Sequence, residues 1–187
     1  MDYVVLDLEW NQASDSRDAR NRLLTFEIIE IGAVKLNSRM EIVDTFEELI
    51  RPQVYDTMHH ITEKLIGIHM KDLSGCRTFD VVMKDFLAWC GEDFMFGTWG
   101  PQDLTELQKN MRFFGMEPLG KGPVRFYDIQ KLFSIAYEDQ KVRRSLEYAV
   151  DYLQIPKDIP FHRAISDAVY TLSLIHISEP TRRRGIS

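Results

Sequence analysis

Apolar and polar residues alternate along the first fifty residues in the manner of β-strands. Three runs rich in β-branched, aromatic and aliphatic residues follow one another, at residues 3–9, 26–36 and 41–50. A short polar turn at 37–39 separates the second run from the third, and this arrangement predicts a β-hairpin. We therefore expect three antiparallel strands at the start of the fold.

Beyond Pro52 the apolar residues recur at helical spacing. Residues 79–90 carry one apolar face, with Thr78 as the expected N-cap and Gly91 as the expected stop. The further predicted elements are a short helix entered at Thr62, a strand at 94–99, a helix between Pro101 and Gly115, a strand at 124–129, and helices beginning near Ile129, Ser145 and Arg163. Antiparallel strands followed by alternating helices and strands predict an α/β fold, a mixed five-stranded sheet with helices on both faces.

Composition narrows the class of protein. A chain of 187 residues is expected to form one domain with a sizeable core. Its net charge of −6 argues against a broad basic surface, so any contact with nucleic acid must be local or assisted by metal ions. Cys76 and Cys90 have no metal-ligand spacing and do not suggest a disulfide scaffold. The sequence offers neither a signal peptide nor a membrane span, and we expect a cytoplasmic protein.

Residues 172–187 do not continue the regular pattern of apolar and polar positions seen in the rest of the chain. The segment LSLIHISEPTR, which begins at Leu172, resembles the translation of a transposase adaptor used in sequencing libraries. We therefore expect a single domain over residues 1–171 and a non-native tail over 172–187. The alternative is a solvated basic tail, and we derive no function from its arginines.

Two acids interrupt the first strand, in the segment VVLDLEWNQ. Because side chains alternate along a strand, Asp7 and Glu9 point to one face, about 6.6 Å apart at Cα. Like charges on one face of an apolar strand are unfavourable unless a cation lies between them. The alternative is a strand with one solvent-exposed face.

Three later residues are further candidates for a catalytic or metal-binding site because of their positions in the predicted elements. Asp103 follows the strand at 94–99, at a junction that exposes side chains at the carboxyl edge of a sheet. His162 and Asp167 are five residues apart and can meet if His162 lies on the loop before a helix, as Pro160 suggests. Each has an ordinary structural explanation when taken singly: an acid at a helix start, a hydrogen-bonded loop histidine, and a solvent-facing helix acid.

Taken together, the carboxylates suggest a metal centre. Oxygen ligands with open positions suit Mg²⁺ or Mn²⁺ better than zinc. Two such ions, about 3.5–4 Å apart, can stabilise the attacking and leaving oxygens of a phosphoryl displacement.

The joint pattern resembles the DEDDh 3′–5′ exonucleases of the ribonuclease H-like fold, which include RNase T and the proofreading subunit of bacterial DNA polymerase III. The similar segments are VVLDLEWNQ, FGTWGPQDLTELQ and HRAISDAVYTL for the three motifs, with FEIIEIGAVKL and HITEKLIGI between them. The resemblance spans residues 3–172 and is greatest to the Eri-type and KapD-like branch.

The resemblance implies a role for each of five residues. Asp7 would bridge two Mg²⁺ ions, or Mn²⁺ in their place. Glu9 and Asp167 would complete the tighter site, and Asp103 would hold the second ion directly or through water. His162 would be the general base for the attacking water, a role that suits imidazole, whose unperturbed pKa of about 6.5 lies near working pH. The implied product is a 5′-mononucleotide released from the 3′ end of single-stranded RNA or DNA, with RNA slightly favoured.

Substrate contacts are less defined by the sequence. Trp10 is predicted to stack on the terminal base, Asn11 to meet the terminal nucleotide, and Leu65 or Ile68 to wedge against the last base. Ordinary packing is the alternative for each apolar side chain. Candidate phosphate contacts are Arg17, Arg20, Arg22, Arg143 and Arg144.

Two other functions fit the same fold. One is a regulatory or nucleic-acid-binding protein that acts through a partner, and the other is a phosphodiesterase for small dinucleotides. The sequence indicates no membrane partner and does not identify a protein partner.

Overall fold

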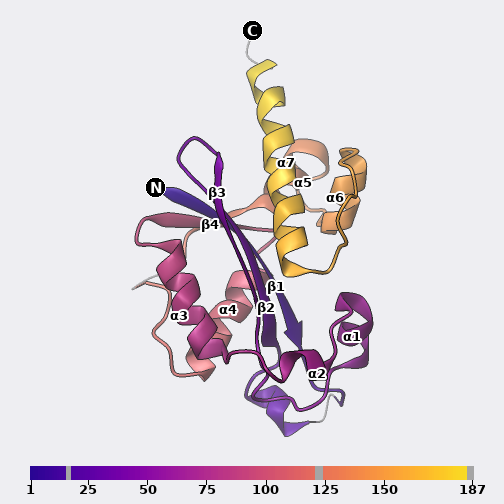
Figure 1. The fold of residues 1–187 in the computed structure, drawn as a ribbon. Coiled ribbons are helices and arrows are strands. Elements are labelled where there is room, and N and C mark those ends of the chain that lie inside the picture. Colours follow the sequence, from indigo (N-terminus) through magenta and orange to yellow (C-terminus); the bar gives the residue numbers. More distant parts are fainter. Residues whose placement is uncertain (16–17, 121–123, 185–187) are drawn as a thin grey trace.

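The computed structural model describes residues 1–15, 18–120 and 124–184, without the side chains of Ala19, Asn21 and 177–184. A five-stranded sheet in the order β3-β2-β1-β4-β5 forms its centre (Figure 1). The strands are β1 (Asp2–Asn11), β2 (Glu27–Leu36), β3 (Ile42–Leu49), β4 (Phe94–Thr98) and β5 (Phe126–Asp128). The first three are antiparallel, β4 runs parallel to β1, and β5 runs parallel to β4. The predicted mixed five-stranded sheet is confirmed.

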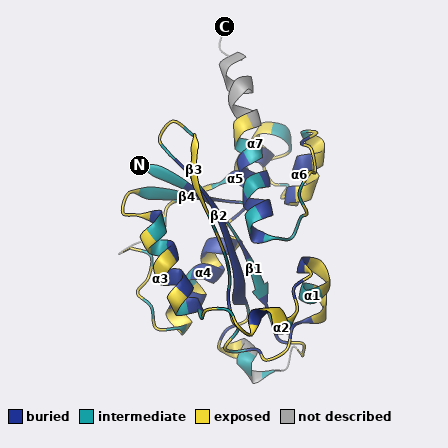
Figure 2. Cartoon of the chain, viewed as in Figure 1, coloured by how far each residue is buried: buried dark blue, intermediate teal, exposed yellow. Residues whose placement is uncertain are grey.

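Helices cover both faces of the sheet (Figure 1). They are η1 (Ala19–Arg22), α1 (His60–Ile66), α2 (Met70–Leu73), α3 (Phe79–Cys90), α4 (Gln102–Phe113), α5 (Ile129–Tyr137), α6 (Leu146–Tyr152) and α7 (Ala164–Arg184). Helices α3 and α4 pack on one face and α7 packs on the other, while α1 and α2 lie where β1 ends. Figure 2 shows the central strands largely buried and the outer sides of α3 exposed.

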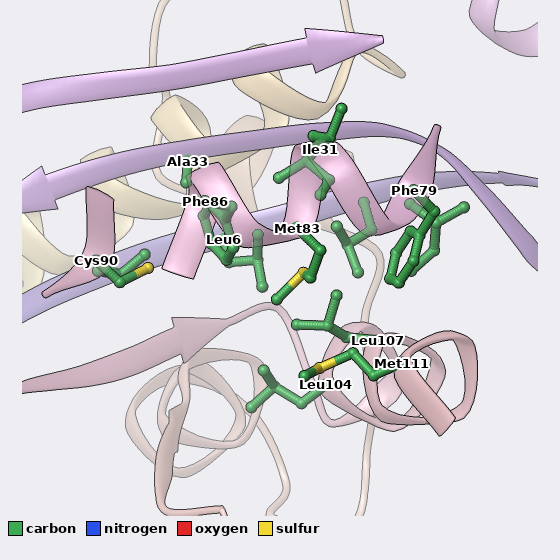
Figure 3. Close-up of a cluster of buried hydrophobic side chains, with 14 of the residues drawn as sticks. Leu6, Ile31, Ala33, Phe79, Met83, Phe86, Cys90, Leu104, Leu107 and Met111 are labelled. Atoms are coloured by element: carbon green, nitrogen blue, oxygen red, sulfur yellow. The ribbon is translucent and has the colours of Figure 1, made fainter. Parts of the chain in front are cut away.

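The alternation of β1 divides the core into two layers. Val4, Leu6 and Leu8 face α3 and α4, in a cluster where Leu6 lies among side chains such as Met83 and Leu107 (Figure 3). The opposite face belongs to a second cluster, formed by Val5, Val34, Leu36, Ala168 and Leu172. Because the larger apolar face is filled by α3 and α4, Asp7 and Glu9 must point toward α7.

Local details differ from the sequence prediction at two places. Helix α1 begins at His60, two residues before the expected start, and the short helix α2 was not predicted. His69 and Asp72 stabilise α2 through a reciprocal capping box. The sequence did not predict this helix, because capping boxes are usually recognised by Ser or Thr at the N-cap and not by His. Ser145 caps α6 as predicted, since its hydroxyl accepts a hydrogen bond from the backbone N–H of Tyr148.

Helix α7 continues across the position where a foreign tail was predicted to begin. Leu172 and Leu174 are 3% and 2% exposed, and both pack in the core. The tail over 172–187 stays a prediction. Within the described ranges, no helix combines the length and the apolarity that crossing a membrane requires.

Candidate active site

Asp7 and Glu9 lie on β1, the middle strand of the sheet. Their cross-strand neighbours on β2 are Gly32 and Glu30, respectively. Gly32 is essential to the geometry, because a Cβ atom there would lie 2.0 Å from the backbone nitrogen of Ile165. The absence of a side chain lets the start of α7 lie directly against the sheet beside Asp7.

Asp103 enters the same region from the first turn of α4. Its side chain is 5% exposed, and its Oδ1 accepts a hydrogen bond of 3.2 Å from the backbone N–H of Leu8. This bond joins α4 to β1 between the two acids of the strand. The position in the first helical turn favours a negatively charged side chain.

His162 and Asp167 come from the entry to α7. His162 has φ +62°, in the left-handed region, where a non-glycine residue is strained by about 1 kcal/mol or more. Its backbone N–H donates to Asp167 Oδ1 at 3.3 Å. Ligand atoms of Glu9, His162 and Asp167 all lie within 4.8 Å of one another. The loop position predicted for His162 and the helical position predicted for Asp167 agree with this geometry.

The carboxylates of this cluster repel one another; Asp103 and Asp167 are buried, and Asp7 and Glu9 are half-buried. Burial, reinforced by the neighbouring acids, raises the pKa of Glu9 to about 8 and holds the pKa of Asp7 well above its usual range. Burial likewise raises the pKa of Asp103 to about 7 and that of Asp167 to about 6. Clustered oxygen donors that destabilise one another's charge are the donor set that divalent cations stabilise, so these residues fit Mg²⁺ or Mn²⁺.

The sequence profile of the RNase T exonuclease family matches residues 4–175. The chain belongs to this family. The match confirms the predicted family and identifies an exonuclease domain over residues 4–175. Exonucleases of this family depend on divalent metal ions, in agreement with the donor set at the site.

Relatives of this exonuclease include two curated proteins. The chain is 26% identical over 186 residues to the PolC-type DNA polymerase III of Caldanaerobacter subterraneus subsp. tengcongensis, covering 99% of this chain and 12% of that protein. It is 24% identical over 153 residues to the human 3'-5' exoribonuclease 1, covering 76% of this chain and 43% of that protein. The chain therefore spans less than half the length of either relative.

A solved structure supports the fold of this exonuclease. It is the nuclease domain of 3'hExo, described as a DEDDh family member bound to rAMP. The TM-score is 0.75 at 20% identity, covering 95% of this chain and 92% of that chain. The ribonuclease H-like fold expected from the sequence is thereby confirmed.

The residues predicted to contact substrate differ in their accessibility. Trp10 packs partly against Phe26, with ring centroids 5.5 Å apart, whereas Leu65 on α1 is 49% exposed. Asn11 is fully buried: its amide donates to the carbonyl of Thr57 and accepts from the backbone N–H of His59. This geometry favours Asn11 as a support for the segment leading into α1 rather than as the predicted nucleotide contact.

The arginines predicted to contact phosphate have carboxylate partners. Arg143 binds Asp128, and Arg144 binds Glu138. Arg20, in the short helix η1, pairs with Asp18 and Asp56. Arg17 lies outside the described residues, and Arg22 is exposed. Paired arginines are less available to phosphate than the sequence alone suggested.

Sequence reasoning did not identify the role of Glu30 and Arg163. Glu30 is fully buried on β2 and pairs with Arg163, next to His162. The signal was present, because a glutamate within the apolar run FEIIEIGAVKL requires a partner when that run is buried. The partner lies far away in the sequence and only the fold reveals it.

The pKa values at the site predict how metal-free protein responds to pH. An acid with a folded-state pKa above its unfolded value binds more protons when folded, so stability falls as pH rises between those two values. For Asp167, Asp103 and Glu9 this window runs from their usual values of 3.8–4.5 up to about 8. We expect the melting temperature in EDTA to fall steadily from pH 5 to pH 8.

Calorimetry or circular dichroism in matched buffers measures this effect. Addition of Mg²⁺ at pH 8 should restore part of the lost stability, because a ligand that binds only the folded state stabilises it. A melting temperature that rises between pH 5 and pH 8 in EDTA would contradict the proposed repulsion.

Proposed function

We propose that this domain is a metal-dependent 3′–5′ exonuclease that removes 5′-mononucleotides from single-stranded nucleic acid. The observation that carries the proposal is the convergence of four acids and a histidine from β1, α4 and the entry to α7. Ligand atoms of Glu9, His162 and Asp167 lie within 4.8 Å of one another, and the charge of Asp7 is disfavoured by both Asp103 and Asp167. Carboxylates clustered beside a histidine provide ligands for divalent ions and a general base in one site.

The residues divide the chemistry between them. Asp7, Glu9, Asp103 and Asp167 would hold two divalent ions, which when bound lower the pKa of water and neutralise charge on the phosphate and leaving oxygens. His162 would accept the proton of the attacking water through its imidazole. Asp167 also accepts the backbone N–H of His162, so it helps to fix the base while it serves as a ligand.

The substrate side of the site lies toward α1. We assign Trp10 and Leu65 to the terminal nucleotides. The side chain of Leu65 is exposed on α1, and so is that of Ile61, one turn earlier on the same helix. An apolar pair on an exposed helix face can pack against a base. Asn11 would act indirectly, by holding the residues before α1.

We favour RNA over DNA as the substrate. The human relative is named an exoribonuclease, and the 3'hExo domain was described with rAMP. We also assign the protein to the cytoplasm, where the free thiols of Cys76 and Cys90 would be stable.

A gel assay tests the function directly. Single-stranded RNA and DNA of one sequence, each labelled at the 5′ end, are incubated with protein and Mg²⁺ or Mn²⁺. We expect a ladder that shortens from the 3′ end by single nucleotides, faster on RNA, and no shortening in EDTA.

An assay in which both substrates stay intact would be equally informative. Intact RNA and DNA in every metal-containing lane, from protein that melts cooperatively, would contradict the proposal. Turnover of a dinucleotide in parallel would then favour a small-substrate phosphodiesterase, and retention of intact oligonucleotide on a filter would favour a binding protein.

A further inference from the structure

The entry loop of α7, residues 159–163, carries His162 and is held on one side by an ion pair. The guanidinium of Arg163 donates through Nε and lies 2.9 Å from Glu30 Oε1. Its Nη2 also lies 3.2 Å from Glu47 Oε1 on β3. The residue directly after His162 is therefore tied to two neighbouring strands of the sheet.

The other side of the entry loop is held by Tyr170, two turns along α7. Its hydroxyl donates to the carbonyl of Ile159 at 2.6 Å and accepts from the backbone N–H of the same residue. Its ring stacks on Phe161, with centroids 4.4 Å apart. These contacts fix the loop to its own helix, whereas the Arg163 contacts fix it to the sheet.

Glu30 connects the ion pair to the metal ligands. It is fully buried and lies directly opposite Glu9 in the β1–β2 ladder. Side chains directly opposite one another in an antiparallel pair lie on the same face, about 5 Å apart at Cβ. Glu30 Oε1 accepts from Arg163, while its other oxygen has no hydrogen-bond partner among the described atoms.

A buried ion pair is a poor way to gain stability, because desolvation offsets the attraction. We attribute to this ion pair a different effect: it restrains the position of the neighbouring residue His162. His162 must keep a left-handed backbone and a ring position close to Glu9 and Asp167. A planar guanidinium that contacts carboxylates of two strands restrains the adjacent residue more tightly than an apolar side chain would.

We propose that Glu30 and Arg163 form a positioning pair, which holds the entry loop so that His162 stays aligned with Glu9 and Asp167. The pair touches neither substrate nor reacting atoms and acts through His162. This inference rests on the proposed exonuclease function, with His162 as its general base.

Four variants test the positioning pair: Arg163→Gln, Glu30→Gln, Arg163→Lys and the double variant Glu30→Gln/Arg163→Gln. The matched control is Arg77→Gln, because Arg77 likewise joins β3 to another element, through Glu48 and Asp85. For each protein we would measure kcat and KM on single-stranded RNA, the melting temperature, and amide hydrogen exchange over residues 159–167.

A positioning role predicts a specific pattern. Arg163→Gln should lower kcat about 10- to 100-fold with KM changed by less than about threefold, since supporting residues act on alignment more than on binding. Arg163→Lys should recover part of kcat. The double variant should be no slower than Arg163→Gln alone, because the two residues act as one unit. Arg77→Gln should leave kcat unchanged.

Amide exchange provides a readout that does not need activity. The backbone N–H of His162 donates to Asp167, so its exchange should accelerate in Arg163→Gln and stay slow in Arg77→Gln. Unchanged exchange at His162, or a kcat within twofold of the unmodified protein, would overturn the positioning pair. An unmodified protein without activity would instead contradict the exonuclease proposal, and the exchange result would still decide the structural part.

Discussion

Asp7→Asn should reduce exonuclease activity by at least about 10³-fold and at the same time raise the melting temperature of the metal-free protein. Asp7 belongs to a cluster in which burial and Asp103, Asp167 and Glu9 all disfavour its charge. Removing one charge relieves that repulsion. Loss of Asp7 as a proposed metal ligand would remove several kcal/mol of transition-state stabilisation, at about 1.4 kcal/mol for each tenfold in rate.

Thermal melts in EDTA at pH 8, paired with the gel assay in Mg²⁺, measure both effects on one preparation. Each kcal/mol gained should raise the melting temperature by about 2–4 °C in a domain of this size. Glu92→Gln is the control, because Glu92 is an exposed acid outside the site. A variant that loses activity and also melts lower than the unmodified protein would show that Asp7 has a structural role we have not assigned.

Gly32→Ala should disrupt both stability and catalysis. The new Cβ would lie 2.0 Å from Ile165 N and 2.1 Å from the carbonyl carbon of Ala164, both of them backbone atoms in the first turn of α7. We expect overpacking to cost about 1–3 kcal/mol, and displacement of His162 and Asp167 to lower kcat about 10²-fold.

The control is Gly75→Ala, since an added Cβ at Gly75 meets no atom within 4 Å. Denaturant unfolding gives the stability of each variant, and the gel assay gives its rate. If Gly32→Ala were as active and as stable as Gly75→Ala, the close approach of α7 to β2 would not be needed for the site.

Much of this fold can be predicted because its signals are local. The alternation in β1 separates Leu6 and Leu8 from Asp7 and Glu9, and this separation survives in the structure as the division between the α3–α4 layer and the α7 side. The extents of α3 and α4 follow from apolar spacing bounded by Gly91 and Gly115. Local chemistry of this kind needs no knowledge of distant partners.

Features that depend on strand register could not be predicted in the same way. Glu30 and Arg163 are 133 residues apart, and their pairing depends on how the start of α7 lies on β2. Asn11 lies just beyond the strand predicted at 3–9 and was expected to meet the terminal nucleotide, yet the segment at 57–59 covers it. The candidate ligands were singled out by their positions in the sequence and given roles by the family resemblance, whereas the residues that support them became visible only in the three-dimensional arrangement.

The two ends of the domain meet at the proposed catalytic centre, because Asp7 comes from β1 and Asp167 from α7. During translation, the site therefore cannot assemble until nearly the whole domain has left the ribosome. Domains generally fold as units as they emerge. On the proposed assignment of ligands, a nascent chain or a degradation product that lacks α7 would therefore be inactive, because it would lack both His162 and Asp167.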